Sequence, residues 1–122
     1  DYLAQRPEIK DYAETVKSHG TTGGSITCNL EDGNIHTITL NAATTFTFSN
    51  PPASGKAGSF TLILTQASTA KSVTWPSSVK WVGGYTPYLS GDSTDYVLVF
   101  LTTDAGTTWR GWLSGSAFAT PS

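Results

Sequence analysis

The chain has 122 residues, of which only 13% are charged, and its formal net charge is −2. A chain of this length is expected to form one domain with a core of its own. It has no cluster of lysine or arginine, so it lacks the basic surface that nucleic-acid phosphates require, and it has no apolar run as long as a membrane span. We therefore expect neither a nucleic acid nor a membrane as a partner.

The first predicted element is a short amphipathic helix at residues 6–18. Pro7 suits a first helical position, and Gly20 suits the end of the helix. A helix of about 12 residues is marginal in water, so its apolar stripe should pack on another surface. We predict that residues 1–20 form a helical assembly segment. The predicted interface residues, which recur at helical spacing, are Ile9, Tyr12 and Val16.

A glycine-rich joint at residues 21–24 is expected to connect this helix to a β domain at residues 25–122. Residues 31–34 and 104–106 have the composition of hairpin turns, with glycine at a left-handed position in the second, so neighbouring strands are expected to pair antiparallel. No helical pattern separates the strands, which favours an antiparallel β-sandwich, jelly-roll-like in architecture. The predicted strands are residues 25–30, 35–40, 44–49, 58–66, 72–75, 79–82, 95–103 and 107–114.

Alternation along these strands predicts which side chains face the core. The predicted inward residues are Ile26, Cys28, Leu30, Ile38, Leu40, Phe46, Phe48, Phe60, Leu62, Leu64, Val97, Val99 and Leu101. Cys28 is the only cysteine, which excludes an intrachain disulfide and any multi-cysteine metal site. We expect it to be a buried apolar residue, with a reactive thiol as the alternative. The chain begins with Asp1, as a processed chain or a fragment would.

Residues that could carry catalysis are sparse. His19 and His36 fall in different predicted elements, and the chain has no third histidine and no His-x-x-x-His pair. The carboxylates at predicted turns are explained by turn chemistry, with an acid–base pair or a calcium site as the alternative; they are Glu31, Asp32, Asp92, Asp95 and Asp104. We therefore predict no catalytic residue, no metal ligand and no cofactor, and hence no enzyme.

Aromatic residues cluster in two regions of the sequence. Exposed rings on a β surface can stack on sugar rings, so a glycan platform is one interpretation of this cluster. The predicted platform residues are Trp81, Tyr85, Tyr88 and Trp112. Trp109 and Trp112 have opposite parity in one strand, so one of them should face the core. The alternative is that exposed rings serve subunit contacts, because aromatic residues are common at interfaces.

Four segments carry a resemblance to a known group of proteins: Phe46 to Gly55, Ser59 to Gln66, Val73 to Trp81 and Asp95 to Trp109. Through these four segments, residues 31–118 resemble β domains of bacteriophage virion proteins, namely those of tail fibres, other appendages and capsid decorations. The resemblance implies a non-enzymatic virion structural protein that self-associates, commonly as a homotrimer, and docks on a capsid or tail protein.

The small size of the chain favours a compact capsid-surface or connector role over a host-range fibre, which carries a long shaft. A carbohydrate-binding module that recognises a bacterial surface glycan is the alternative function.

Overall fold

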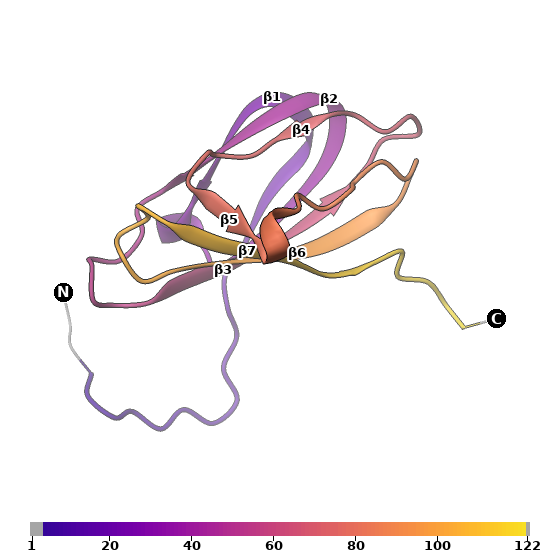
Figure 1. Cartoon of the computed structure of the whole chain (residues 1–122). Coiled ribbons are helices and arrows are strands. Elements are labelled where there is room, and N and C mark those ends of the chain that lie inside the picture. The colour runs from indigo at the N-terminus through magenta and orange to yellow at the C-terminus, as the bar shows by residue number, and fades with distance from the viewer. Residues whose placement is uncertain (1–3, 122) are drawn as a thin grey trace.

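The computed structural model describes residues 4–121, and within them the fold is built from strands and two short 3₁₀ turns (Figure 1). The prediction of an all-β fold is confirmed. No helix in the described part of the chain is long and apolar enough to cross a membrane. The elements are β1 (Val16–Asn29), η1 (Leu30–Asp32), β2 (Ile35–Ser49), β3 (Gly58–Thr65), β4 (Val73–Thr74), β5 (Val79–Trp81), η2 (Val82–Gly84), β6 (Asp95–Thr102) and β7 (Trp109–Ser116).

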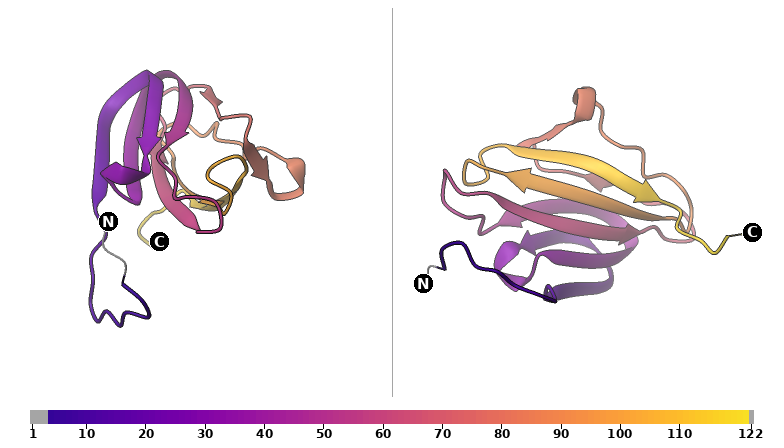
Figure 2. Two further views of the ribbon diagram at one scale, coloured as in Figure 1. Left: turned by 90° about the vertical axis from the view of Figure 1, so that its left-hand side faces the viewer. Right: turned by 90° about the horizontal axis from the view of Figure 1, so that it is seen from below.

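The strands form one mixed sheet of order β1-β2-β3-β6-β7-β5, with β4 paired to β2 outside this path. A sandwich of two separate sheets was expected, but this sheet is continuous. It curls so that β1, β2 and β4 lie over β3, β6 and β7 (Figures 1 and 2). The curl lets a single sheet enclose its own core.

The N-terminal part of the sheet winds in parallel rungs. Strand β1 bends near its middle, and β2 follows the same path beside it, so the two strands pair in parallel from Val16↔Ile35 to Asn29↔Ser49. The first half of β2 then pairs in parallel with β3, and its second half pairs in parallel with β4. We call residues 16–74 the rung region. Its three rungs are residues 16–34, 35–57 and 58–74.

Gly23 lies at the bend of β1, beside Ala42 of β2. A Cβ atom at this position would lie 2.8 Å from the Cβ of Ala42 and 2.9 Å from the carbonyl oxygen of Ala42. Such distances are too short for any side chain, because the obstacle includes backbone. Glycine therefore allows the bends of successive rungs to stack.

The C-terminal part is an antiparallel arrangement, which we call the hairpin region (residues 95–116). Strand β6 pairs antiparallel with β3 on one side and with β7 on the other. The predicted turn at residues 104–106 is confirmed, with Gly106 at φ +81°. The Asp104 carboxylate accepts hydrogen bonds from the Thr102 hydroxyl at 3.0 Å and from the Thr108 N–H at 2.9 Å, which closes the turn locally.

Aromatic side chains from both regions meet in the core. Phe60 of β3 stacks on Phe100 of β6 with ring centroids 5.1 Å apart, and it meets Phe48 and Trp109 edge to face. The buried apolar residues are Cys28, Ile38, Leu40, Phe46, Phe60, Leu62, Leu64, Val79, Leu89, Tyr96, Leu98, Phe100 and Trp109. This shared core joins the rung region to the hairpin region.

The predicted N-terminal helix is wrong. Residues 4–15 contain no helix, and residues 16–24, including the predicted joint at 21–24, lie within β1. Two causes explain the difference. A helix this short needs a surface to cover its apolar stripe, and the β-branched residues from Val16 to Thr22 favour a strand that can pair with β2.

The expectation of antiparallel pairing is wrong for the rung region and for β5, which pairs in parallel with β7. Residues 31–34 were predicted as a hairpin turn, but η1 and Gly33 lead the chain into the next parallel rung. The pairing of β3 with β6 and of β6 with β7 is antiparallel, as expected.

The predicted inward face of β6 is also wrong. Val97, Val99 and Leu101 are only partly buried, whereas the alternate residues Tyr96, Leu98, Phe100 and Thr102 are buried. Both faces of this strand are apolar, so alternation alone could not choose between them. Pairing decides: Phe100 lies opposite Phe60 and Leu98 lies opposite Leu62, and directly opposite residues share a face.

Candidate functional site

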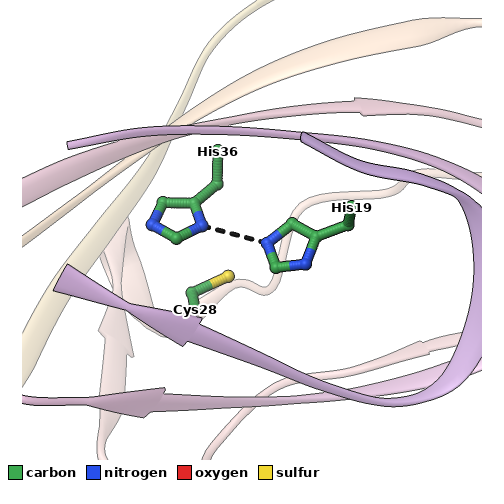
Figure 3. Close-up of side chains that lie close together, drawn as sticks. All are labelled: His19, Cys28 and His36. Atoms are coloured by element: carbon green, nitrogen blue, oxygen red, sulfur yellow. Dashed lines mark hydrogen bonds between the residues drawn. The ribbon is translucent and has the colours of Figure 1, made fainter. Parts of the chain in front are cut away.

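The main concentration of chemically active side chains lies inside the first two rungs. His19 and Cys28 come from β1, on either side of its bend, and His36 comes from β2. One ligand atom from each residue can be chosen so that all three lie within 4.8 Å of one another. Figure 3 shows the Cys28 sulfur directed toward the space between the two imidazole rings. The chain has two histidines and one cysteine in total, and all of them meet here.

Hydrogen bonds fix the orientation of His36. Its Nε2 lies 3.0 Å from the carbonyl oxygen of Gly33, which can only accept, so Nε2 carries the proton. The Nδ1 of neutral His36 is then a lone-pair acceptor that faces His19, whose Nε2–H donates to it at 3.0 Å. The two rings stack with centroids 5.2 Å apart. The arrangement therefore presents the His36 lone pair to the interior of the cluster.

Burial keeps the cluster uncharged near neutral pH. It lowers the pKa of His36, against the opposing effect of hydrogen bonds to the Gly33 and Asn29 backbone. It also lowers the pKa of His19, with a smaller contribution from the positive charge that His36 can carry. Burial raises the pKa of the Cys28 thiol to about 12. The predicted burial of Cys28 is confirmed, and a thiol with this pKa is a poor nucleophile.

Sequence reasoning missed this cluster because it placed His19 at the end of a helix and His36 in a separate strand. A weak internal repeat could have revealed it. In the parallel register, Ile26 to Asn29 lie beside Phe46 to Ser49, and Thr27 and Thr47 join their hydroxyls at 2.9 Å. A repeat with a period of 20 residues is typical of solenoid folds, in which successive repeats stack. Recognising it would have placed the two histidines in adjacent rungs.

The predicted aromatic platform is divided between two clefts. Trp81 and Trp112 line one of about 300 Å³, together with Lys80 and Arg110. Tyr88 lines the other, and Tyr85 lines neither. Trp109 is buried and Trp112 is partly exposed, as their opposite parity predicted.

The cleft at Tyr88 is the larger of the two, at about 450 Å³, and Trp75 also lines it. Hydroxyl groups and one ammonium group surround these rings; they belong to Ser72, Thr86, Ser90 and Lys71. Gln66 holds the two loops that form its walls. Its side-chain Nε2 donates to the carbonyl oxygens of Lys71 and Leu89 at 2.8 and 2.6 Å, and its Oε1 accepts from the Lys71 N–H at 2.8 Å.

The predicted interface residues of the N-terminal segment are exposed. Ile9 and Tyr12 lie in the irregular residues before β1, and Val16 begins that strand; these three residues are 65%, 69% and 57% exposed. They share no helical stripe. Three of the predicted turn carboxylates have structural roles, since those of Asp92, Asp95 and Asp104 each accept backbone hydrogen bonds.

Comparison with known proteins gives one family. Residues 17–105 match the family described as "Putative phage tail fibre C-terminal domain". The chain belongs to this family. The match covers the rung region from its second residue onward, β5 and all of β6, and it confirms the resemblance to phage virion structural domains. Membership of the tail fibre family places the chain in the virion, on the tail. A search of curated proteins found no match, and neither did a search of solved structures.

Proposed function

We propose that this tail fibre domain is a non-enzymatic structural module that associates with copies of itself, as a trimer, and docks on another protein of the tail. Of the roles that the resemblance implies, a tail appendage agrees with the family, and we propose it over capsid decoration.

The observation that carries this proposal is the apolar outer face of β6. Val97, Val99 and Leu101 point away from the core and are only partly buried, and Ile63 of β3 lies directly opposite Val97 on the same face. An antiparallel sheet with one solvated face normally places polar residues there. A strand that is apolar on both faces is typical of one that is covered on both.

The N-terminal end of the domain supplies a second surface for association. β1 is an edge strand of 14 residues, and long exposed edges are usually protected in native assemblies. Ile9, Tyr12 and Val16 lie on or just before this edge and leave large apolar groups in water. A stable contact buries roughly 800 Å² on each partner, and we propose that the β6 face and this segment both contribute to it.

A pair of valine variants tests the proposal. Val99→Glu places a charge on the outer face of β6, whereas Val82→Glu places the same charge on η2, where Val82 is 74% exposed. We expect light scattering to show that Val99→Glu lowers the solution mass to that of a monomer while its circular dichroism spectrum is unchanged. Val82→Glu should keep the mass of the unmodified assembly. Equal masses for Val99→Glu and the unmodified chain would contradict the role of this face.

A second candidate function is recognition of a bacterial surface glycan at the cleft between Trp75 and Tyr88. The combination of aromatic rings with surrounding hydroxyl groups favours it, because rings can stack on sugars while hydroxyls fix their orientation. Tyr88 is 85% exposed and so is available to a ligand. This activity is compatible with a structural module and would add host contact to it.

Two tyrosines provide a matched test. Tyr85 and Tyr88 are similarly exposed, at 82% and 85%, but only Tyr88 lines the cleft. Titration with host surface polysaccharide should quench tryptophan fluorescence saturably, because Trp75 lies in the cleft. Tyr88→Ala should abolish this response and Tyr85→Ala should retain it. The absence of any response across a broad glycan panel would exclude this second function.

A further inference from the structure

We propose that His19, Cys28 and His36 form a binding site for a transition metal ion, with Zn²⁺ as the ion that this donor set favours. The inference is independent of the proposed function, because it rests on the interior of the first two rungs. The bound ion would tie the edge strand β1 to β2 and so hold the first rung closed.

The chemistry of the donors selects the class of metal. Two imidazole nitrogens and one thiolate are the ligands of zinc sites, whereas calcium and magnesium take oxygen ligands. Three protein ligands leave one position of a tetrahedral ion for water or an added ligand. No group that would favour a hard cation is among the three residues.

The geometry is close to what zinc requires. Tetrahedral zinc with bonds of about 2.0–2.3 Å places its ligand atoms roughly 3.3–3.6 Å apart. The facing nitrogens of His19 and His36 are 3.0 Å apart, and the three ligand atoms lie within 4.8 Å of one another. Entry of the ion therefore requires the two rings to separate slightly and the sulfur to approach by at most about 1.5 Å.

The surroundings of His36 resemble the outer shell of a metal site. A histidine ligand usually donates its second ring N–H to a carbonyl or carboxylate, which sets the tautomer and the ring orientation. His36 Nε2–H already donates to the Gly33 carbonyl, so Nδ1 carries the lone pair, which accepts from His19 in this structure and would bind a metal in its place. His19 would release Nε2 by carrying its proton on Nδ1. Metal binding would also release the proton of the Cys28 thiol to solvent.

The partial exposure of His19 gives the ion a path inward. Cys28 and His36 are fully buried, but His19 lies at the surface end of the cluster and is only partly buried. His19 is not a member of the buried core, so its ring is the one of the three groups whose movement would disturb the core least. Because Cys28 is the only thiol in the chain, a sulfur–metal signal reports on this site alone.

Cobalt(II) provides the direct test, as a spectroscopic substitute for zinc. The full chain, without a histidine tag and kept reduced by a phosphine, is titrated with Co²⁺. We expect a sulfur-to-cobalt charge-transfer band and intense visible bands of tetrahedral Co²⁺, at one ion per chain, and their loss when Zn²⁺ is added. Zn²⁺ alone should raise the Tm of the same protein.

Variants identify the ligands. His19→Gln removes one ligand at the partly exposed position and should weaken Co²⁺ binding by about 100-fold, at least as much as loss of an outer-shell partner. Cys28→Ser should remove the charge-transfer band. Lys17→Gln is the control, since Lys17 lies on the same strand but offers no ligand at this site, and it should bind Co²⁺ as the unmodified chain does.

Two results would overturn the proposal. One is a folded, reduced chain that gives no charge-transfer band at saturating Co²⁺ and no change of Tm with Zn²⁺. The other is an equal rise of Tm with Zn²⁺ in the unmodified chain, His19→Gln and Cys28→Ser, which would show that the ion binds surface carboxylates instead. Circular dichroism of each variant confirms that it is folded, and the spectrum of the unmodified chain decides the question even if a variant is not.

Discussion

The rung region and the hairpin region share one sheet, but they are specified in different ways. In the hairpin region, β6 and β7 are neighbours in sequence and are joined by a turn that Asp104 and Gly106 close locally. In the rung region, residues that pair are 18 to 29 positions apart, as Ile26 and Phe46 or Thr44 and Val73 are, and no local turn signal specifies the pairing. The three clustered side chains, His19, Cys28 and His36, lie in the rung region. Reactive residues that are distant in sequence therefore come together in the region whose pairing is least predictable from local turn and alternation patterns.

The largest expected effect comes from breaking the contact that unites the two regions. Phe60→Ala removes the ring that stacks on Phe100 and meets Phe48 and Trp109. We expect a loss of about 3–5 kcal/mol in the free energy of unfolding, because a large cavity forms in a shared core. Denaturant unfolding measures the loss. Hydrogen exchange should show both regions losing protection together; loss confined to one region would show that they are stabilised separately.

A smaller loss is expected where a buried side chain, Gln66, fastens a loop of the rung region to the loop that precedes β6. Gln66→Leu leaves the Lys71 N–H and the carbonyl oxygens of Lys71 and Leu89 without their partner. Buried polar groups without partners cost about 1–3 kcal/mol, so we expect a loss in this range or slightly above it. Thermal unfolding checks it. A variant as stable as the unmodified chain would mean that the loops are held by other contacts.

The stacking of rungs is tested by an overpacking substitution. Gly23→Val forces a side chain against the backbone of Ala42, so we expect a loss of about 1–3 kcal/mol. Gly20→Ala is a control in the same strand, since its Cβ would meet nothing within 4 Å, although its φ of +72° adds some strain. Hydrogen exchange should place the effect of Gly23→Val in β1 and β2. An effect centred on β6 and β7 would contradict the conclusion that Gly23 is needed for the stacking of β1 on β2.

The smallest effect distinguishes the regions by pH. Burial lowers the pKa of His19 and His36 below the usual value of 6.5; the charge of Lys17 lowers the pKa of both further, and that of Asp32 raises it. Below about pH 6.5 the unfolded chain binds protons that the folded chain does not, so stability should be constant above that pH and fall as the pH decreases. The slope should not exceed about 1.4 kcal/mol per pH unit for each histidine.

Denaturant unfolding between pH 7.5 and lower values measures this slope. His19→Gln removes one of the two titrating groups and should make the decline shallower. Stability that increases as the pH falls below 6.5 would show that the histidines are stabilised in their charged form, which is opposite to the effect of burial.

Much of the fold could be predicted from the sequence because strand alternation and turn composition are local. The strands from Gly58 onward lie close to their predicted ranges, and Gly106 takes the left-handed conformation that the turn requires. The inward face of β6 could not be predicted, since Val97 and Leu98 are both apolar and only the register with β3 selects Leu98 for the core.

The candidate site was less accessible to sequence reasoning. The helical spacing of Ile9, Tyr12 and Val16 was real as a pattern, but pairing with β2 drew Val16 into a strand. That mistake separated His19 from His36, because nothing in the sequence predicts a contact between the end of a helix and a separate strand. The split of the aromatic residues between two clefts also depends on tertiary structure, since Trp81 and Trp112 are 31 positions apart along the chain.

The most direct test of the proposed function is the solution mass of the unmodified chain, measured by light scattering over a range of concentrations. We predict a mass about three times the 12.9 kDa of one chain, as expected if the outer face of β6 is covered by other copies. A mass of 12.9 kDa at every concentration would contradict self-association through this face.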